Sequence, residues 1–361
     1  MVRRPAKEKH IAVFGETGSG KTTLLSVFYG HQQSVDFSKN AGYSLLAMDT
    51  TQGQKLLQTY HRIEDNLLPP QTRFHQKEFH FRIRVQGIQQ DTCNLVWHDY
   101  PGEWWTETRS GEENDRKMAS FKTLLRSDIA LFLVDGQRLR ENQNNYLVRL
   151  FKSFRDEIQR LHNNFNENNV SLNIFPRIWI ICLSKADLFP GKDVEWFRKE
   201  VLKSVADEIA ALSEEIKSMV KKPEYVSIGN DFLLLSSSKF DPETGRVVDP
   251  SQTVGVDLIS PLSIMVPLYY ARKWAKIESF SKTTVTRCTE IFRSLTTNWT
   301  KWIPIVGRTI QMLDVSMTEM VEKLQKSQDR ATRKNDVINE LLDALDGRLR
   351  NAQAQKIYIT Q

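Results

Sequence analysis

Short apolar runs recur along the chain, and longer amphipathic stretches separate them. The runs at residues 128–136, 177–185 and 231–237 have continuously apolar centres. Such runs are typical of strands buried on both faces of a mostly parallel sheet. Stretches with helical character lie near residues 141–166 and 194–220. Alternating strands and helices predict the α/β class, with an open, mostly parallel sheet flanked by helices.

A second pattern, strict alternation of apolar and polar residues, marks residues 78–87 as a strand. Its apolar face holds Phe79, Phe81, Ile83 and Val85. The apolar run 93–99 follows after a short connection. Two strands in such close succession predict a hairpin.

Eight residues near the start of the chain, GETGSGKT at 15–22, form a glycine-rich loop. The apolar run 10–14 precedes it, and a helix-like stretch with Gly30 as its predicted C-cap follows. Between a strand and a helix, the loop's backbone N–H groups and the helix N-terminus bind phosphate. Lys21 is expected to bridge the outer phosphates of a nucleotide, and the Thr22 hydroxyl to bind Mg²⁺. The predicted nucleotide-binding residues of this segment are Gly15, Glu16, Thr17, Gly18, Ser19, Gly20, Lys21, Thr22 and Thr23.

The segment DYPGE ends the run 93–99, and ligands of open α/β sheets bind at such strand ends. Asp99 is expected to hold Mg²⁺ through a water molecule. Gly102 is expected to offer its backbone N–H to the terminal phosphate. Loss of that phosphate would release the segment, as in switches that nucleotides order and disorder.

Two further motifs, SKAD at 184–187 and SSSK at 236–239, also lie at strand ends. The Asp187 carboxylate is expected to accept hydrogen bonds from the ring N–H and the exocyclic amine of guanine, a donor pair that adenine lacks. The Lys185 stem is expected to lie along the base, and a backbone N–H of SSSK to meet the guanine oxygen. The predicted base-binding residues are Ser184, Lys185, Asp187, Ser237, Ser238 and Lys239.

In their order, GETGSGKT, DYPG, SKAD and SSK resemble the motifs of the Ras-like, translation-factor-related class of P-loop GTPases. The resemblance covers about residues 8–282. Within the class, D-x-P-G-E followed by aromatic residues looks most like bacterial GTPases of the double-GTPase group. The resemblance implies a P-loop GTPase domain at residues 1–282 that binds GTP or GDP with Mg²⁺ and hydrolyses the γ-phosphate of GTP.

The resemblance also implies a Mg²⁺-binding switch threonine just before the second strand of the class. A long insertion at residues 31–76 is expected to contain this first switch. Thr72 stands directly before the strand and is the preferred residue, with Thr50 and Thr51 as alternatives. Within the insertion, helical spacing predicts one apolar face that packs on the domain, made by Leu56, Tyr60, Ile63 and Leu67.

Two positions depart from the pattern of the class. Ser184 replaces the usual asparagine or threonine, and its hydroxyl is expected to tie the base motif to the glycine loop. Glu103 stands where Ras-like enzymes have a glutamine that orients the attacking water. Glu103 either positions that water or points to solvent, and both interpretations stay open.

Catalysis is assigned to Lys21, Thr72, Gly102 and Glu103. No arginine finger is evident, although Arg73 and Arg109 are candidates, so hydrolysis without a partner or self-association is expected to be slow. The adjacent Trp104 and Trp105 either form a partner-binding hot spot or fill the fold.

Composition adds limits to this interpretation. The 361 residues are 40% hydrophobic and 26% charged, which is ordinary for a globular protein. Cys93, Cys182 and Cys288 are far apart and lack metal-ligand spacing, which favours a reducing compartment. The N-terminus has no secretory signal pattern, and the apolar run 258–271 is shorter than a bilayer span. We therefore expect a cytoplasmic protein without a transmembrane helix.

The net charge of +6 is concentrated in residues 271–310, which hold eight Lys and Arg against two acids. Residues 286–313 mix these basic residues with aromatic ones. Three interpretations stay open: a helical hairpin packed on the GTPase domain, peripheral contact with a membrane, or binding of a partner or of single-stranded nucleic acid. Packing on the domain is the simplest of the three, and nucleic acid is disfavoured.

Residues 283–361 are predicted to form an α-helical C-terminal extension. Two apolar clusters have helical spacing: Met317, Met320, Val321 and Leu324, and then Val337, Ile338, Leu341, Leu342, Leu345 and Leu349. The polar stretch 325–336 between them argues against a continuous coiled coil. The two helical pieces are expected to dock on a protein partner or in a homodimer.

The sequence thus predicts a GTP-binding molecular switch with slow, Mg²⁺-dependent hydrolysis, which engages a partner through its switches and its extension. Two alternatives stay open. One is a membrane-associated scaffold of dynamin-like behaviour. The other is a nucleotide-binding module without turnover.

Overall fold

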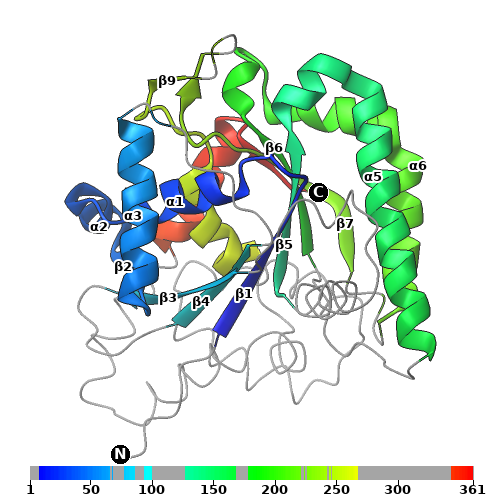
Figure 1. The fold of residues 1–361 in the computed structure, drawn as a ribbon, viewed down its shortest axis with the longest axis horizontal. Helices are drawn as coiled ribbons and strands as arrows, with labels where there is room; N and C mark the ends of the chain where they lie inside the picture. The colour runs from blue at the N-terminus through cyan, green and yellow to red at the C-terminus, as the bar shows by residue number, and fades with distance from the viewer. Residues whose placement is uncertain are drawn as a thin grey trace, which may run out of the picture.

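The computed structural model describes residues 8–65, 67, 77–85, 93–99, 127–167, 178–220, 223, 226–241, 244, 246–266 and 343–360. These residues form three layers, a central sheet with helices on both faces (Figure 1). The predicted α/β class and the open, mostly parallel sheet are confirmed.

The central sheet has the strand order β10-β7-β6-β5-β1-β4-β3-β2. Its members are β1 (Glu8–Phe14), β2 (Tyr43–Ala47), β3 (Lys77–Val85), β4 (Cys93–Asp99), β5 (Ile129–Asp135), β6 (Ile178–Ser184), β7 (Ser227–Leu234) and β10 (Tyr358–Ile359). Strands β7, β6, β5, β1 and β4 run parallel, and β3, β2 and β10 are antiparallel to their neighbours. The segments that follow the parallel strands therefore meet at one edge of the sheet.

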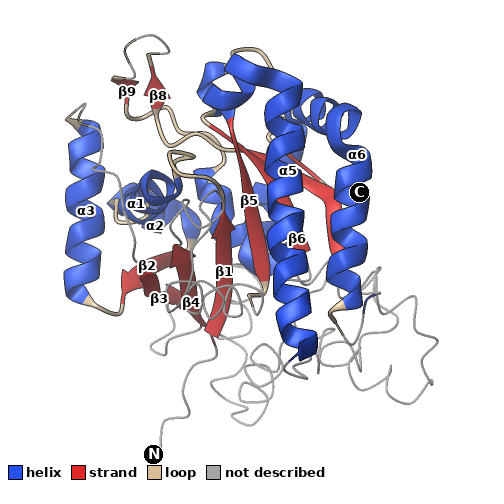
Figure 2. Ribbon diagram, turned by 45° about the vertical axis from the view of Figure 1, so that its right-hand side comes forward, coloured by secondary structure: helices blue, strands red, loops and turns tan. Residues whose placement is uncertain are grey.

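Two hydrophobic cores hold the layers together, one on each face of the sheet. The first face carries α1 (Lys21–His31), α3 (Thr50–Glu64) and the helical residues 259–266 and 343–354. The other face carries α5 (Gly136–Glu167) and α6 (Val194–Ser218), which lie side by side (Figure 2). The short elements are α2 (Val35–Ala41), η2 (Ala186–Leu188), β8 (Lys239–Phe240), β9 (Val247–Asp249) and η4 (Val256–Leu258). Strands β5 and β6 are buried along their whole length, as expected of strands covered on both faces.

The predicted hairpin is confirmed, since β3 and β4 pair antiparallel with Lys77 opposite Asp99. Phe79, Phe81 and Ile83 on the predicted apolar face of β3 are buried in the first core. The insertion adds an edge strand that was not predicted, β2, which pairs with β3. Its five residues are too few to show a clear alternation in the sequence.

The helix predicted within the insertion is α3. Leu56 and Ile63 are buried in the first core and Tyr60 packs against it, whereas Leu67 lies beyond the helix and is exposed. Gly30 was predicted to cap the first helix but lies inside α1. A Cβ at Gly30 would lie 2.2 Å from the Tyr60 ring, so the absent side chain lets α3 approach α1. The C-cap prediction was therefore wrong.

The end of the chain returns to the sheet. Leu345 and Leu349 of the helical residues 343–354 are buried in the first core, and β10 pairs with β7. The Tyr358 hydroxyl donates a hydrogen bond to the buried Asp231 carboxylate at 2.7 Å. A helix in the C-terminal extension is thus confirmed. Its residues Leu345 and Leu349 pack on the chain's own core, so the predicted docking of this piece on a partner or a second copy was wrong. The division between residues 282 and 283 stays a prediction.

Several predicted features lie outside the described residues. They are Thr72, Arg73, Gly102, Glu103, Trp104, Trp105, Arg109, the stretch 286–313 and the apolar positions from 317 to 342. Among the helices that the structure describes, none has the length and apolar character needed to cross a membrane.

An ion pair joins the end of α1 to η4. The Nδ1 atom of His31 lies 2.7 Å from the Asp257 carboxylate. The hydrogen bond to the Asp257 carboxylate raises the pKa of His31 above its ordinary 6.5, although burial opposes the shift. The two side chains are 35% and 40% exposed, so solvent screening reduces what the pair contributes to stability.

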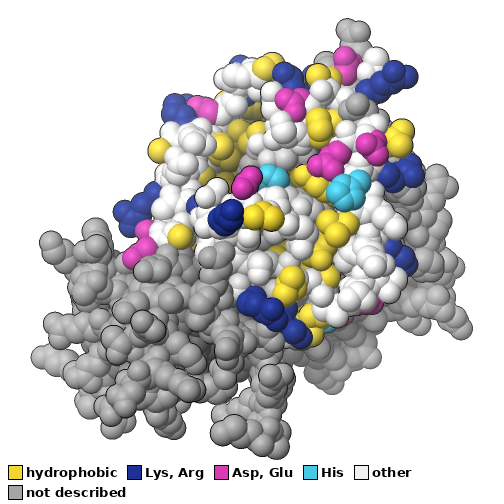
Figure 3. Space-filling view, turned by 90° about the vertical axis from the view of Figure 1, so that its left-hand side faces the viewer, with side chains coloured by type: hydrophobic (Ala, Val, Ile, Leu, Met, Phe, Trp, Pro, Cys, Tyr) yellow, Lys and Arg dark blue, Asp and Glu magenta, His cyan; other side chains and the backbone are white. Residues whose placement is uncertain are grey.

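The molecular face that contains α2 and α3 mixes charged side chains of both signs with histidine and apolar side chains (Figure 3).

Asp257→Asn is expected to destabilise the protein more at about pH 5.5 than at about pH 8.5. Because the pKa of His31 is raised in the folded state, the stabilisation by its protonation is fully present below the unfolded pKa. It is lost as the pH rises through the folded pKa. Urea unfolding of the wild type and the variant at both pH values measures the effect. An equal loss of unfolding free energy at the two pH values would contradict this role of His31.

Candidate nucleotide-binding site

The glycine loop joins β1 to α1 at the edge where the parallel strands end (Figure 2). Gly18 and Gly20 have φ angles of 84° and 89°, in the left-handed region that favours glycine. The buried Lys21 ammonium donates to the carbonyls of Gly15 at 2.7 Å and Glu16 at 3.0 Å. Its charge therefore lies within the curve of the loop, beside amides of the kind that bind phosphate.

The other predicted loop residues surround this centre. Ser19 is completely buried, and its backbone N–H donates to the Glu16 carbonyl at 3.2 Å. Thr17 and Gly18 line a pocket beside the loop. Thr22 and Thr23 lie half-buried in the first turn of α1.

The two predicted Mg²⁺ residues of the described chain, Thr22 and Asp99, lie together. The Thr22 hydroxyl donates to Asp99 Oδ2 at 3.0 Å, because β1 pairs with β4 and Asp99 lies opposite Val13. With its proton directed to Asp99, the hydroxyl has lone pairs to offer a cation. Mg²⁺ prefers oxygen ligands and retains several waters, so a hydroxyl beside a carboxylate fits it.

His98, the neighbour of Asp99 in β4, adds no positive charge to this corner. It is 1% exposed, and burial, together with repulsion from His10 and His80, lowers its pKa to about 3. His98 is therefore neutral at physiological pH, and a cation beside Asp99 meets no competing charge from it. Within the described ranges, no group of three or more His, Cys, Asp and Glu is placed to hold a metal ion.

Asp187 lies in η2, directly after β6. One carboxylate oxygen accepts from the Ser236 hydroxyl at 2.6 Å, and the other accepts from the Phe240 N–H at 2.9 Å. A carboxylate has about four lone-pair sites, so Asp187 retains acceptor capacity for two donors of a ligand. Neither Ser236 nor Phe240 was among the predicted base-binding residues, yet these two residues fix the orientation of the carboxylate.

The predicted residues that follow Ser236 lie close to Asp187. Ser237 is half-buried, and Lys239 is exposed at the start of β8. Ser238 is buried, and its carbonyl oxygen lies 2.6 Å from Ser236 Oγ, so the carbonyl and Asp187 share the single proton of that hydroxyl.

Ser184 and Lys185, the first two residues of the SKAD motif, make contacts that the sequence did not predict. The Ser184 hydroxyl donates to the Val134 carbonyl at 3.2 Å, so the predicted tie of Ser184 to the glycine loop was wrong. The Lys185 ammonium lies 2.9 Å from the carboxylate of Asp135, which is 2% exposed. Asp135 ends β5 as Asp99 ends β4, and this strand-end position was a signal that could have found it.

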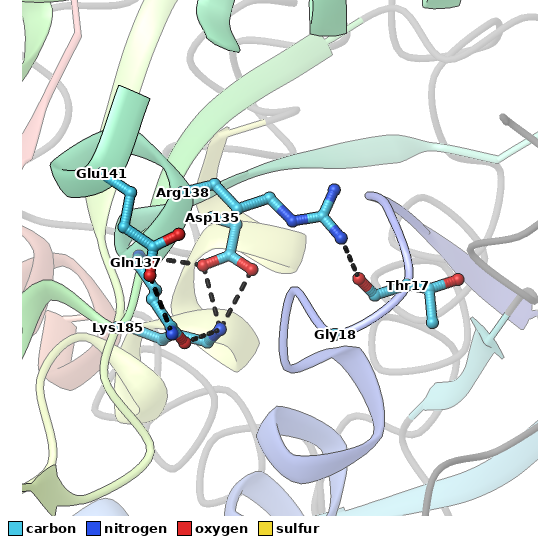
Figure 4. Close-up of a pocket in the computed structure, with 7 residues that line it drawn as sticks. All are labelled: Thr17, Gly18, Asp135, Gln137, Arg138, Glu141 and Lys185. Carbon is cyan, nitrogen blue, oxygen red and sulfur yellow. Dashed lines mark hydrogen bonds and ion pairs between the residues drawn. The ribbon is translucent and has the colours of Figure 1, made fainter. Parts of the chain in front are cut away.

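A pocket of about 300 Å³ lies between the glycine loop and these strand ends (Figure 4). It is lined by Thr17, Gly18, Asp135, Gln137, Arg138, Glu141 and Lys185. Arg138 reaches from the first turn of α5 to the loop, where it forms an ion pair with Glu16 and donates to the Thr17 carbonyl at 3.0 Å. Arg138 precedes the helical stretch predicted near residues 141–166, and nothing in the sequence distinguishes it from other arginines.

The strand order, the glycine loop and the acids at the strand ends define a P-loop GTPase-type protein. The family model Double-GTPase 2 matches residues 9–227, more than half of the 361 residues. The chain therefore belongs to the Double-GTPase 2 family, and the predicted resemblance to the double-GTPase group is confirmed. It is accordingly a GTP-binding protein of the general class of GTP hydrolases.

Three solved structures are among those similar to this chain. The signal recognition particle receptor SRb-GTP/SRX complex of Chaetomium thermophilum matches with 13% identity over 66% of this chain and 93% of that chain, at a TM-score of 0.33. A nucleolar GTP-binding protein 1 of Plasmodium falciparum matches with 14% identity over 76% of this chain and 92% of that chain, at a TM-score of 0.34. The translation elongation factor SelB of Methanococcus maripaludis, in complex with a GTP analogue, matches with 13% identity over 73% of this chain and 34% of that chain. The TM-score is 0.28. A comparison with curated proteins gave no match.

Asp135→Asn is expected to weaken binding of GDP about tenfold, because it removes the carboxylate that holds the Lys185 ammonium. Titration with a fluorescent GDP analogue measures the change. Glu141→Gln is the matched control, since Glu141 lines the same pocket but bonds to Gln137. Equal affinities of the wild type and a folded Asp135→Asn variant would argue against a role for Asp135 in orienting Lys185.

Proposed function

We propose that this protein is a GTP-binding molecular switch that hydrolyses GTP slowly with Mg²⁺ and engages a protein partner. The observation that carries the proposal is the 3.0 Å hydrogen bond between Thr22 and Asp99. It joins the phosphate-binding loop to the start of the DYPGE segment, the predicted second switch. A ligand bound at this corner touches both parts of the chain, so its phosphates control the position of the switch.

In this proposal Lys21 bridges the outer phosphates, and Thr22, Asp99 and Thr72 hold Mg²⁺. The ion supplies positive charge that offsets the charge on the transferred phosphoryl group. The register of β3 favours Thr72, because Thr72 precedes Lys77 by five residues and Lys77 lies opposite Asp99. The alternatives Thr50 and Thr51 are exposed at the start of α3.

Guanine selectivity is assigned to Asp187, whose carboxylate is oriented by Ser236 and Phe240 and retains acceptor capacity. The stem of Lys185 lies along the base, and a backbone N–H within residues 237–239 meets the guanine oxygen. Adenine offers no pair of donors to this carboxylate, so the site rejects ATP.

Hydrolysis is assigned to the segment after Asp99. The Gly102 N–H contacts the terminal phosphate, and Glu103 either positions the attacking water or points to solvent. Without an arginine supplied to the transition state the rate stays low, so a partner or a second copy accelerates the reaction. The GTPase domain spans residues 1–282 in this proposal, and the extension 283–361 contributes to the engagement of the partner.

Asp187→Asn is expected to weaken binding of GTP by about 100-fold or more. The variant is also expected to accept xanthosine triphosphate, because its amide offers a donor to the carbonyl that replaces the guanine amine. Calorimetric titration of both proteins with GTP, GDP, ATP and xanthosine triphosphate in Mg²⁺ measures these affinities. Wild-type protein that binds ATP as tightly as GTP would refute the assignment of Asp187.

Phosphate release from the wild type with GTP and Mg²⁺ is expected at a slow rate, on the order of 10⁻⁴ to 10⁻² s⁻¹. Lys21→Ala is expected to abolish the release, because the outer phosphates lose their ammonium partner. Release without detectable difference between the two proteins would reveal a contaminating activity. Binding of GTP without release from either protein would identify a module without turnover and overturn the proposed hydrolysis.

A further inference from the structure

The glycine loop carries a carboxylate, Glu16, directly after its first glycine. A fixed negative charge in this loop repels the phosphates that the loop amides and the helix N-terminus attract. The Glu16 side chain is only 13% exposed, so water and salt screen its charge poorly. A loop that binds phosphates therefore needs something to offset this charge.

The backbone of Glu16 lies at the centre of the loop. Its carbonyl accepts from the Lys21 ammonium at 3.0 Å and from the Ser19 N–H at 3.2 Å. The Glu16 carboxylate is therefore about one side-chain length from the loop backbone that would surround the phosphates. Over that distance like charges repel appreciably, because it is shorter than or comparable to the Debye length of about 8 Å at physiological salt.

Arg138 supplies the offsetting charge. One guanidinium nitrogen forms an ion pair with the Glu16 carboxylate, and another donates to the Thr17 carbonyl at 3.0 Å. Figure 4 shows the side chain extending from α5 across the pocket to the loop at Thr17. The planar fork of an arginine suits such a double contact, which fixes the carboxylate and the adjacent backbone together.

We propose that Arg138 is a positioning residue for the nucleotide: it neutralises Glu16 and holds the carboxylate toward α5, away from the bound phosphates. The inference rests on the proposed function, since it presumes a nucleoside triphosphate in the glycine loop. It adds a determinant of phosphate affinity that none of the motifs contains. The competing explanation is that Arg138 only holds α5 and the loop together and does not act through its charge.

The double variant separates the two explanations. Arg138→Ala leaves the Glu16 charge unopposed, so binding of GTP is expected to weaken about tenfold, and binding of GDP less, because GDP carries less charge. Glu16→Gln removes the charge itself and is expected to bind GTP within about twofold of the wild type. Combining Glu16→Gln with Arg138→Ala is expected to restore most of the lost affinity, which the loss of a structural brace would not allow.

The experiment is calorimetric titration of the full chain with GTP and GDP in Mg²⁺, with circular dichroism to verify folding. Arg140→Ala is the control, because Arg140 is an exposed arginine on the same turn of α5 that does not line the pocket. Arg138→Lys keeps the charge without the fork and is expected to bind more tightly than Arg138→Ala. If Arg138→Ala alone does not fold, the GTP affinities of Arg138→Lys and of the double variant are compared with that of the wild type instead.

The inference is overturned if the double variant binds GTP as weakly as Arg138→Ala, or if both single variants match the wild type. It is also overturned if Arg138→Ala weakens GTP and GDP equally. A wild-type protein that binds neither nucleotide would instead remove the proposed function, so the two failures are distinguishable.

Discussion

The parallel pairing of the five middle strands is the constraint on which the site depends. It brings residues far apart in the sequence to one edge, with Asp99 opposite Val13 and Asp135 opposite Ser184. Helices pack on both faces of these strands, and close-packed interiors resist the shift of any single strand end. The packing of the sheet therefore sets the geometry of the site, because it fixes the strand ends from which the loops begin.

Three cationic side chains at this edge are paired with carboxylates or held by backbone groups. Lys185 pairs with Asp135, Arg138 pairs with Glu16, and Lys21 is held by carbonyls of its own loop. Unpaired charges would be costly at this depth, because burial penalises them. The arrangement also has a functional consequence. Groups that are already held in one orientation need little reorganisation when a ligand binds, and such preorganisation is the main source of electrostatic stabilisation in enzymes.

The sequence predicted β5, β6 and β7 because strands buried on both faces leave continuous apolar runs. It also predicted that Thr22 and Asp99 lie together, because both follow strands of one sheet. The edge strands β2 and β10, of five and two residues, were missed, since pairing with neighbours rather than their own pattern stabilises them. Arg138 was missed for a related reason. It acts on the loop through a contact between residues 122 positions apart, and no motif records such a contact.

The return of the C-terminus covers an edge of the sheet that would otherwise offer its backbone groups to another chain. The Leu234 N–H of β7 donates to the Ile357 carbonyl at 2.9 Å, two residues before the Ser236 that orients Asp187. The helical residues 259–266 and 343–354 pack on the same core. The end of the chain is thus connected to β7, and through β7 to the segment that orients Asp187.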